Sequence, residues 1–191
     1  MDAPRPAATV VLAREGARGP EVLVLRRGAG HRFLPGFVVF PGGAVEPDDA
    51  ALAGRWFGEP AEAARACALR ELAEEVGLAL TGRGAVGTDD PLGAVDADPP
   101  TAGRLVEISH WVAPPDVPVR FDARFFAALA PRTLEPRADG GETEHAWWAR
   151  PSDLLAGGDG DLYLPTRCVL EALATCDDAA AILAARIEQV E

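Results

Sequence analysis

Apolar residues gather in short, nearly continuous runs along this chain, and such runs are typical of strands buried inside a sheet. Two of them, residues 7–13 and 21–27, flank a glycine-bounded segment at 16–19, which predicts a β-hairpin with a longer loop. A third run, 37–40, ends directly before Gly42 and Gly43. We expect this run to be a strand that leads into a glycine turn, where the backbone can approach another group closely.

Further along, alternating and helical patterns predict the remaining elements. Strands are expected over the ranges 105–112, 121–130 and 144–149. Helices are expected over the ranges 49–57, 60–77, 166–174 and 178–190, with a short one starting at 151. In the main helix, Pro60 suits the first turn and Gly77 suits the C-terminal cap. Its inward face is predicted to carry Ala64, Cys67, Ala68, Leu72 and Val76.

The segment 82–103 is rich in glycine, proline and small acidic residues. We expect it to be a mobile excursion rather than a linker between domains. The strands cluster as hairpins instead of alternating regularly with helices, which favours an α/β sandwich with a mixed sheet over a doubly wound fold.

Composition narrows the class of protein. With 191 residues, 48% of them hydrophobic, residues 1–191 are expected to form one domain. The formal charge is −12 and every basic residue is arginine. This balance disfavours nucleic-acid binding, which needs a positive field, but permits a free nucleotide whose phosphates a metal ion neutralises.

The three cysteines and the N-terminal segment indicate in which cellular compartment the protein is expected. Cys67, Cys168 and Cys176 form no Cys-x-x-Cys pair, so we expect reduced thiols rather than disulfides or a zinc site. No basic leader precedes an apolar core, and no apolar stretch approaches the ~20 residues of a membrane span. We therefore expect a cytoplasmic protein without membrane contact, compatible with a homodimer.

Three carboxylates fall on one face of the main helix. Glu71, Glu74 and Glu75 stand at i, i+3 and i+4, where like charges repel. A solvated acidic face would explain these residues taken alone. The neighbouring Arg70, Gly77 and the preceding glycine turn favour a site for Mg²⁺, or alternatively Mn²⁺, which prefer oxygen ligands.

The stretch Arg70-Glu-Leu-Ala-Glu-Glu-Val-Gly77-Leu, preceded by Gly43, resembles the signature of the Nudix hydrolases. Arg70 follows Gly43 by 27 positions (70 − 43), thirteen more than in the usual pattern. We place the insertion at about 48–59, and closure of a longer surface loop costs little free energy. The candidates for the first glutamate of the signature stay open: Glu46, Asp49, Glu59 or Glu62.

The resemblance implies a Nudix-type α/β/α sandwich and a Mg²⁺-dependent pyrophosphohydrolase acting on a nucleoside diphosphate derivative. Patches at 33–43, 120–126 and 164–166 are similar to the enlarged-box subgroup that includes peroxisomal coenzyme A diphosphatase-like proteins. This similarity implies coenzyme A or an acyl-coenzyme A as the substrate. ADP-ribose or a dinucleotide is the enzymatic alternative, and a non-catalytic nucleotide-sensing module is the alternative of a different class.

Residue roles follow partly from the resemblance. Metal ligands are expected from Gly43 through its carbonyl, and from Glu71, Glu74 and Glu75. Glu74 or Glu75 could also act as the general base. Glu142, near His145 in a glycine-led segment, is a further candidate for ligand or base; its alternative is a charged turn before an edge strand.

The arginines and aromatic residues have competing interpretations. Arg26, Arg27 and Arg32 could bind substrate phosphate through their forked donors, or form a solvated basic edge. Arg70 could bind phosphate too, but its acidic neighbours favour an orienting ion pair. Trp111, Phe121 and Phe125 could stack on an adenine ring, although aromatic residues in strands more often fill cores.

Overall fold

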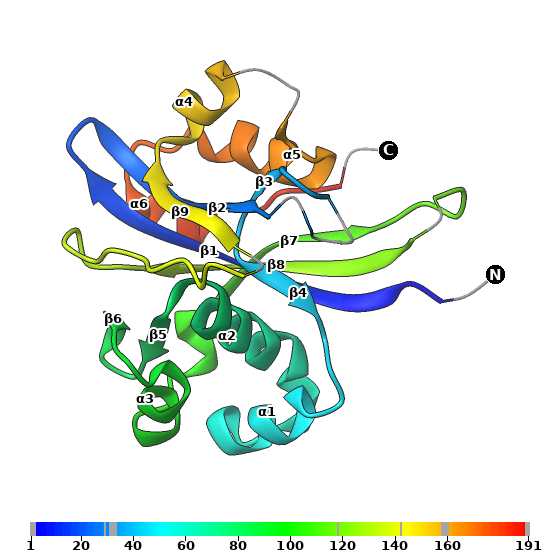
Figure 1. Cartoon of the computed structure of the whole chain (residues 1–191), viewed down its shortest axis with the longest axis vertical. Coiled ribbons are helices and arrows are strands. Elements are labelled where there is room, and N and C mark those ends of the chain that lie inside the picture. The colour runs from blue at the N-terminus through cyan, green and yellow to red at the C-terminus, as the bar shows by residue number, and fades with distance from the viewer. Residues whose placement is uncertain are drawn as a thin grey trace.

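A mixed β-sheet between two helical layers organises the molecule. The computed structural model describes residues 3–28, 30, 34–117, 119–141, 143–157 and 161–189. One layer holds the helices α1, α2 and α3, and the layer across the sheet holds α4, α5 and α6 (Figure 1). The predicted α/β/α sandwich with a mixed central sheet is confirmed.

The sheet is built around two long strands that are far apart in sequence. Strand β1 (Arg5–Gly16) pairs in parallel with β8 (Phe121–Leu129), and among the described residues the other strand-to-strand pairings, isolated bridges aside, are antiparallel. The main path runs β3-β2-β1-β8-β7, with β4 joined to β1 and β9 joined to β2. The bounds of these other strands are β2 Gly19–Arg27, β3 Val38–Val39, β4 Gly42–Ala44, β7 Val106–Val112 and β9 Thr143–Ala149.

Both faces of the central strands are buried, which explains their continuous apolar runs. On β1, Val10 and Leu12 belong to the core under α2, while Val11 and Ala13 belong to the core on the opposite face. All four side chains are inaccessible to solvent. Alternate residues of a strand point to opposite faces, so a strand covered on both sides must be apolar throughout.

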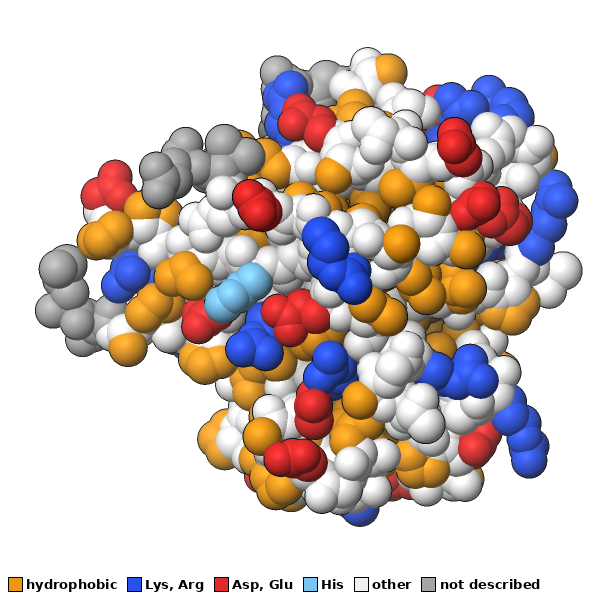
Figure 2. Space-filling view, turned by 180° about the vertical axis from the view of Figure 1, so that it is seen from behind, with side chains coloured by type: hydrophobic (Ala, Val, Ile, Leu, Met, Phe, Trp, Pro, Cys, Tyr) orange, Lys and Arg blue, Asp and Glu red, His pale blue; other side chains and the backbone are white. Residues whose placement is uncertain are grey.

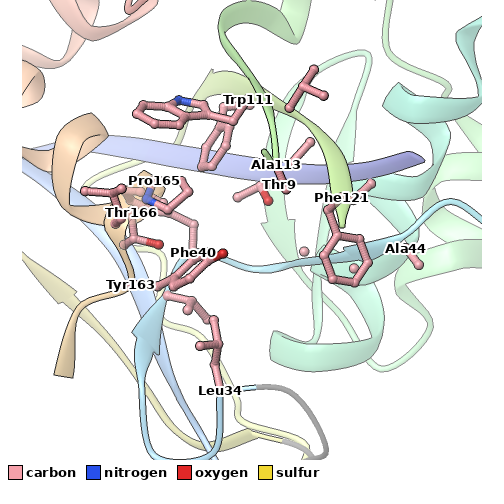
Figure 3. A pocket seen from close by; sticks show the side chains of 18 of the residues that line it. Thr9, Leu34, Phe40, Ala44, Trp111, Ala113, Phe121, Tyr163, Pro165 and Thr166 are labelled. Carbon is pink, nitrogen blue, oxygen red and sulfur yellow. The ribbon is translucent and has the colours of Figure 1, made fainter. Parts of the chain in front are cut away.

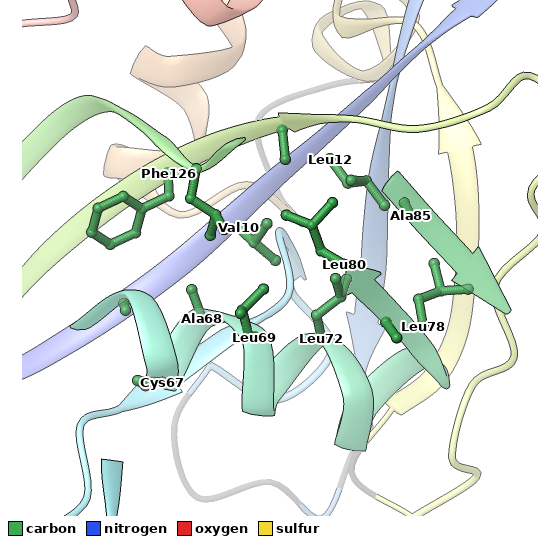
Figure 4. Packing of buried hydrophobic residues seen from close by; sticks show 14 of the residues in the cluster. Val10, Leu12, Cys67, Ala68, Leu69, Leu72, Leu78, Leu80, Ala85 and Phe126 are labelled. Atoms are coloured by element: carbon green, nitrogen blue, oxygen red, sulfur yellow. The ribbon is translucent and has the colours of Figure 1, made fainter. Parts of the chain in front are cut away.

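The first helical layer follows the prediction closely. The insertion forms α1 (Asp49–Phe57), a 3₁₀ turn follows at Pro60–Glu62, and α2 spans Ala63–Val76. Gly77 ends α2 in the left-handed conformation at φ 65°, as a C-cap glycine should. Leu69 and Leu72 of α2 pack against Val10, Leu12 and Phe126 of the sheet, as Figure 4 shows.

The segment after α2 is ordered, so the expectation of a mobile excursion at 82–103 is wrong. Strand β5 (Leu78–Thr81) forms a hairpin with β6 (Gly84–Gly87), and α3 (Pro91–Ala97) is followed by a 3₁₀ turn at Ala102–Arg104. Gly84 supplies the positive φ of 126° that the turn requires. The Asp90 side chain accepts a hydrogen bond from the Gly93 N–H and caps α3.

The second helical layer is shorter at its C-terminal end than predicted. It contains α4 (Pro151–Ala156), α5 (Leu164–Leu173) and α6 (Ala179–Ala184). We expected the last helix to continue to 190, but it ends at Ala184. The chain then becomes extended, because the N–H of Ile187 donates to the carbonyl of Ile108 on the edge strand β7.

The surface agrees with the charge balance of the sequence. On the face shown in Figure 2, arginine and acidic side chains are interspersed, and exposed apolar side chains lie between them. In the described part of the chain, none of the helices combines the length and apolar character that a membrane crossing requires.

Candidate functional site

The site is organised around Arg70, which lies in the middle of α2. Its Nε and Nη2 donate to the two carboxylate oxygens of Asp49 at 2.9 and 3.1 Å. Asp49 is the first residue of α1 and is 0% exposed. Among Glu46, Asp49, Glu59 and Glu62, it is therefore Asp49 that pairs with the arginine, whereas Glu62 pairs with Arg65.

Arg70 also holds two of the three predicted carboxylate ligands of the metal, Glu71 and Glu74. Its Nη1 donates to Glu71 at 2.8 Å and to Glu74 at 2.9 Å, and its Nη2 donates to the carbonyl of Ala44. Burial alone would lower the pKa of Arg70, but Asp49 and Glu71 outweigh it and raise that pKa. With these partners the guanidinium orients carboxylates, which supports the ion-pair interpretation over direct phosphate binding.

The glycine pair Gly42–Gly43, which we expected to form a turn, lies instead in strand β4, because it pairs with β1, and it lies directly against the acidic residues of α2. The Gly42 N–H donates to Oε2 of Glu75 at 2.9 Å, and the Glu75 side chain is buried. A Cβ on Gly43 would lie 2.2 Å from Oε1 of Glu71, so a side chain at position 43 would displace that carboxylate. The pairing of β4 with β1 fixes the position of the glycine pair, because Gly43 lies opposite Ala8. The predicted proximity of Gly43 to the glutamates is thus observed.

Glu71 lies in a partly buried position, with its side chain 14% exposed. Burial raises its pKa above the ordinary 4.5, although Arg70 acts in the opposite direction. Its neighbour Glu74 raises the pKa further, while Arg27 lowers it. A divalent cation beside Glu71 would relieve this cost, and carboxylate with carbonyl oxygens is the donor set that Mg²⁺ and Mn²⁺ prefer. The donor chemistry therefore fits a metal ion.

The carboxylates do not converge on one point, as the ligands of a bound metal ion would. Glu71 and Glu74 face Arg70, while Glu75 faces the Gly42 N–H. Within the described ranges, no three acidic, histidine or cysteine side chains already converge as a metal site. The assignment of Gly43, Glu71, Glu74 and Glu75 as ligands therefore stays a prediction.

The buried thiol of Cys67 contacts the backbone of the same strand, β4. Sγ of Cys67 lies 3.6 Å from the carbonyl of Gly43 and 3.5 Å from that of Ala44. Burial, together with nearby Asp49, raises the pKa of this thiol, so it stays protonated and can donate to these carbonyls.

A cavity of about 850 Å³ lies beside the glycine pair of β4, and Figure 3 shows it from close by. Apolar side chains dominate its lining, and of the described lining residues Arg27 alone carries a charge. Gly42 and Gly43 form part of the wall, so the cavity and the acidic residues of α2 share one boundary. Trp111, Phe121 and Phe125, which were predicted either to stack on a base or to fill the core, all line this cavity.

The predicted phosphate-binding arginines differ in position. Arg27 lines the cavity, and its Nη2 donates to the carbonyl of Gly42 at 3.2 Å. Arg26 points elsewhere, donating to the carbonyl of Gly36 and pairing with Asp161 at 3.0 Å. Arg32 and Glu142 lie outside the described residues. His145 is exposed and stacks on Trp147.

Several lining residues were not recognised from the sequence as a binding wall. They come from the start of α5 and from the extended segment after α6: Tyr163, Leu164, Pro165, Thr166 and Gln189. The Leu-Pro-Thr patch was noted only as part of the family resemblance. Gln189 gave no signal, because its place in the wall depends on a contact across the sheet edge.

Comparison with known proteins agrees with this geometry. The model of the NUDIX domain matches residues 3–167. The chain belongs to the Nudix family. The crystal structure of a NUDIX hydrolase from Alicyclobacillus acidocaldarius superposes with a TM-score of 0.83 at 38% identity, covering 98% of each chain.

Other relatives are more distant. The putative nudix hydrolase 7 of Caenorhabditis elegans is 31% identical over 140 residues, which is 65% of this chain and 44% of that protein. The Nudix chain described here thus spans less than half of that relative. The NUDIX domain of Shewanella oneidensis NrtR, solved with ADP ribose, shares the fold at 16% identity and a TM-score of 0.53, covering 82% of this chain and 79% of its own.

Proposed function

We propose that this Nudix protein is a metal-dependent pyrophosphohydrolase that cleaves the diphosphate linkage of a nucleoside diphosphate derivative. The observation that carries the proposal is the shared boundary of cavity and acidic helix. Gly42 and Gly43 line the cavity and at the same time contact Glu75 and Glu71. A substrate in the cavity would therefore place its diphosphate next to these carboxylates.

The side chains and the carbonyl group of the site would have the following roles. Glu71, Glu74, Glu75 and the Gly43 carbonyl would hold Mg²⁺, or alternatively Mn²⁺, which when bound polarises phosphoryl oxygens and acidifies water. Arg27 would stabilise negative charge at the entrance to the cavity, because it is a forked donor beside Gly42. Arg70 would keep Glu71 and Glu74 in place through its ion pairs. Glu74, half exposed, or Glu75 would accept the proton of the attacking water.

The finer substrate that we propose is coenzyme A or an acyl-coenzyme A. The apolar lining, with Trp111, Phe125 and Leu34 among its side chains, suits the acyl chain of an acyl-coenzyme A better than a second sugar. ADP-ribose and dinucleotides carry instead a second sugar beyond the linkage, and each of its several hydroxyl groups would need a polar partner in the wall. The sensing module without turnover is the competing interpretation of the same site.

A substrate panel tests the proposal. Coenzyme A, acetyl-coenzyme A, ADP-ribose, NADH, diadenosine polyphosphates and nucleoside triphosphates would be assayed with Mg²⁺, using the wild type and Glu75→Gln. The amide keeps the shape and the acceptor for Gly42 but removes the charge, so we expect turnover to fall at least about a hundredfold. Glu59→Gln is the matched control, because Glu59 is exposed and precedes the 3₁₀ turn.

Each outcome decides between the alternatives. Near-normal turnover in Glu75→Gln would remove that residue from the mechanism. Turnover of triphosphates alone would reject coenzyme A, whereas preference for ADP-ribose would favour the runner-up. Tight nucleotide binding without turnover of any compound by the wild type would favour the sensing module.

A further inference from the structure

The edge of the sheet beside the cavity is closed by the segment that follows α6. Strand β7 is the last strand of the sheet path, and on its free side Ile187 forms a parallel bridge with Ser109. Two residues further, the Gln189 side chain holds the backbone of Val112: its Oε1 accepts from the N–H at 2.8 Å and its Nε2 donates to the carbonyl at 2.9 Å. Gln189 thus satisfies both backbone groups of Val112 and itself lines the cavity.

A chain of hydrogen bonds connects this segment with the largest aromatic side chain of the cavity wall. The indole Nε1 of Trp111 donates to Oγ of Ser109 at 2.9 Å, and this hydroxyl donates to the carbonyl of Ile187 at 2.7 Å. Trp111 and Ser109 are both 5% exposed. Because a buried indole N–H needs a partner, the position of Ser109 restricts the orientation of the ring.

An irregularity in β7 brings these groups together. The pairing of β7 with β8 shifts register between Glu107 and Ser109, so Ile108 has no partner on β8. The carbonyl of Ile108 instead accepts from the Ile187 N–H at 2.8 Å. Such a bulge re-aims the following side chains, and here Ser109 and Trp111 point to the same face of the strand.

We infer that the extended segment 185–189 supports the wall of the binding cavity from outside, with Gln189 reaching the wall itself, and determines through Ser109 and Trp111 which apolar group the enzyme accepts. The effect of this segment on substrate choice rests on the proposed function, because it requires that the protein cleaves a diphosphate. Ser109 and Gln189 are positioning residues, because they act on Trp111 and Val112 rather than on the diphosphate. The ligand class is an extended apolar chain, since Trp111 and Phe40 face the cavity (Figure 3) and Phe125 also lines it.

The kinetic test compares coenzyme A with decanoyl-coenzyme A. In Ser109→Ala and in Gln189→Ala, the ratio of kcat/KM for the decanoyl compound to that for coenzyme A should fall about threefold to tenfold, through KM, because each variant loses hydrogen bonds that fix the wall. Ser152→Ala is the matched control, since this serine lies on α4 and contacts Arg150 outside the cavity. An unchanged ratio in both test variants would overturn the inference.

A second measurement does not depend on turnover. Titration with decanoate, followed by tryptophan fluorescence, should give a saturable change in the wild type that is lost in Trp111→Phe. In Ser109→Ala and Gln189→Ala the apparent Kd should rise about threefold to tenfold. If the wild type cleaves none of the diphosphates but decanoate follows this pattern, the proposed function fails and the inference stands. Equal Kd values in the wild type and both variants would overturn the inference even for an active enzyme.

Discussion

The carboxylate of Asp49 and the guanidinium of Arg70 form an ion pair with two hydrogen bonds between the inserted helix α1 and the acidic helix α2. Asp49 is inaccessible to solvent, and the Arg70 side chain is 11% exposed. The pair leaves Nη1 of Arg70 to hold Glu71 and Glu74. Helix α1, which the insertion forms, therefore helps to fix the positions of the Glu71 and Glu74 carboxylates through Arg70.

Removing the charge of Asp49 should release Arg70 toward the other carboxylates. We expect Asp49→Asn to lower the free energy of unfolding by about 1 to 3 kcal/mol, because a charge-assisted hydrogen bond in a buried site is weakened. Turnover should fall as well, since Glu71 and Glu74 would be bound more tightly by the arginine. Chemical denaturation and steady-state kinetics measure both effects. Equal stability of Asp49→Asn and the exposed control Asp48→Asn would contradict the role assigned to this pair.

Gly43 is predicted to tolerate no side chain. In Gly43→Ala the new methyl group would collide with Glu71, which must then move away from β4. We expect turnover to drop at least about tenfold and the apparent affinity for Mg²⁺ to weaken, because a proposed ligand is displaced. Gly54→Ala is the control, since a Cβ there meets only Pro60 at 3.8 Å. Normal metal dependence in Gly43→Ala would show that the contact with Glu71 is dispensable.

The pKa of Glu71 leads to a prediction about metal and pH. Its raised pKa means that the folded protein favours the neutral carboxyl, so its contribution to stability is full below the ordinary carboxyl pKa and is lost as pH rises through the folded-state pKa. At neutral pH in EDTA, Glu71→Gln should therefore unfold at a Tm equal to or above that of the wild type. Added Mg²⁺ should raise the Tm of the wild type more than that of the variant. A variant that is less stable than the wild type in EDTA would refute this account.

Arg26 and Arg27 offer a matched pair, adjacent in sequence but different in surroundings. Arg27→Gln should raise KM for a diphosphate substrate at least about fivefold, because it removes the charged group that lines the cavity. Arg26→Gln removes an exposed pair with Asp161 and should change KM less than about twofold. Comparable effects of the two substitutions on KM would argue against a specific role for Arg27.

The elements that could be predicted from sequence are those with local signals. Helix α2 carries apolar periodicity, Pro60 before it and Gly77 after it, and the central strands are marked by apolar runs. Local signals also misled: the glycines of 82–103 suggested mobility, although Gly84 makes a hairpin turn and Asp90 caps a helix. The helical pattern after 178 was correct locally, but at Ile187 pairing with the sheet edge prevails over helix propensity.

The sequence indicated which residues belong to the site better than it indicated which of them contact one another. The proximity of Gly43 to Glu71 followed from the glycine pair and the resemblance, and the ion pairing of Arg70 followed from the carboxylates next to it in sequence. The choice among four acidic residues for the partner of Arg70 could not be made, because it depends on how α1 folds back onto α2. The cavity could not be foreseen either, since its wall combines residues from strands, α5 and the segment after α6.

The parallel pairing of β1 with β8 has a consequence for biosynthesis. Strand β1 finds this neighbour only after more than about a hundred further residues have been made, and such non-local contacts slow folding. Until β8 emerges from the ribosome, the N–H and C=O groups on this edge of β1 stay open to pairing with other chains. Expression at a reduced rate of synthesis, or with a chaperone that shields nascent strands, should therefore improve the yield of native protein.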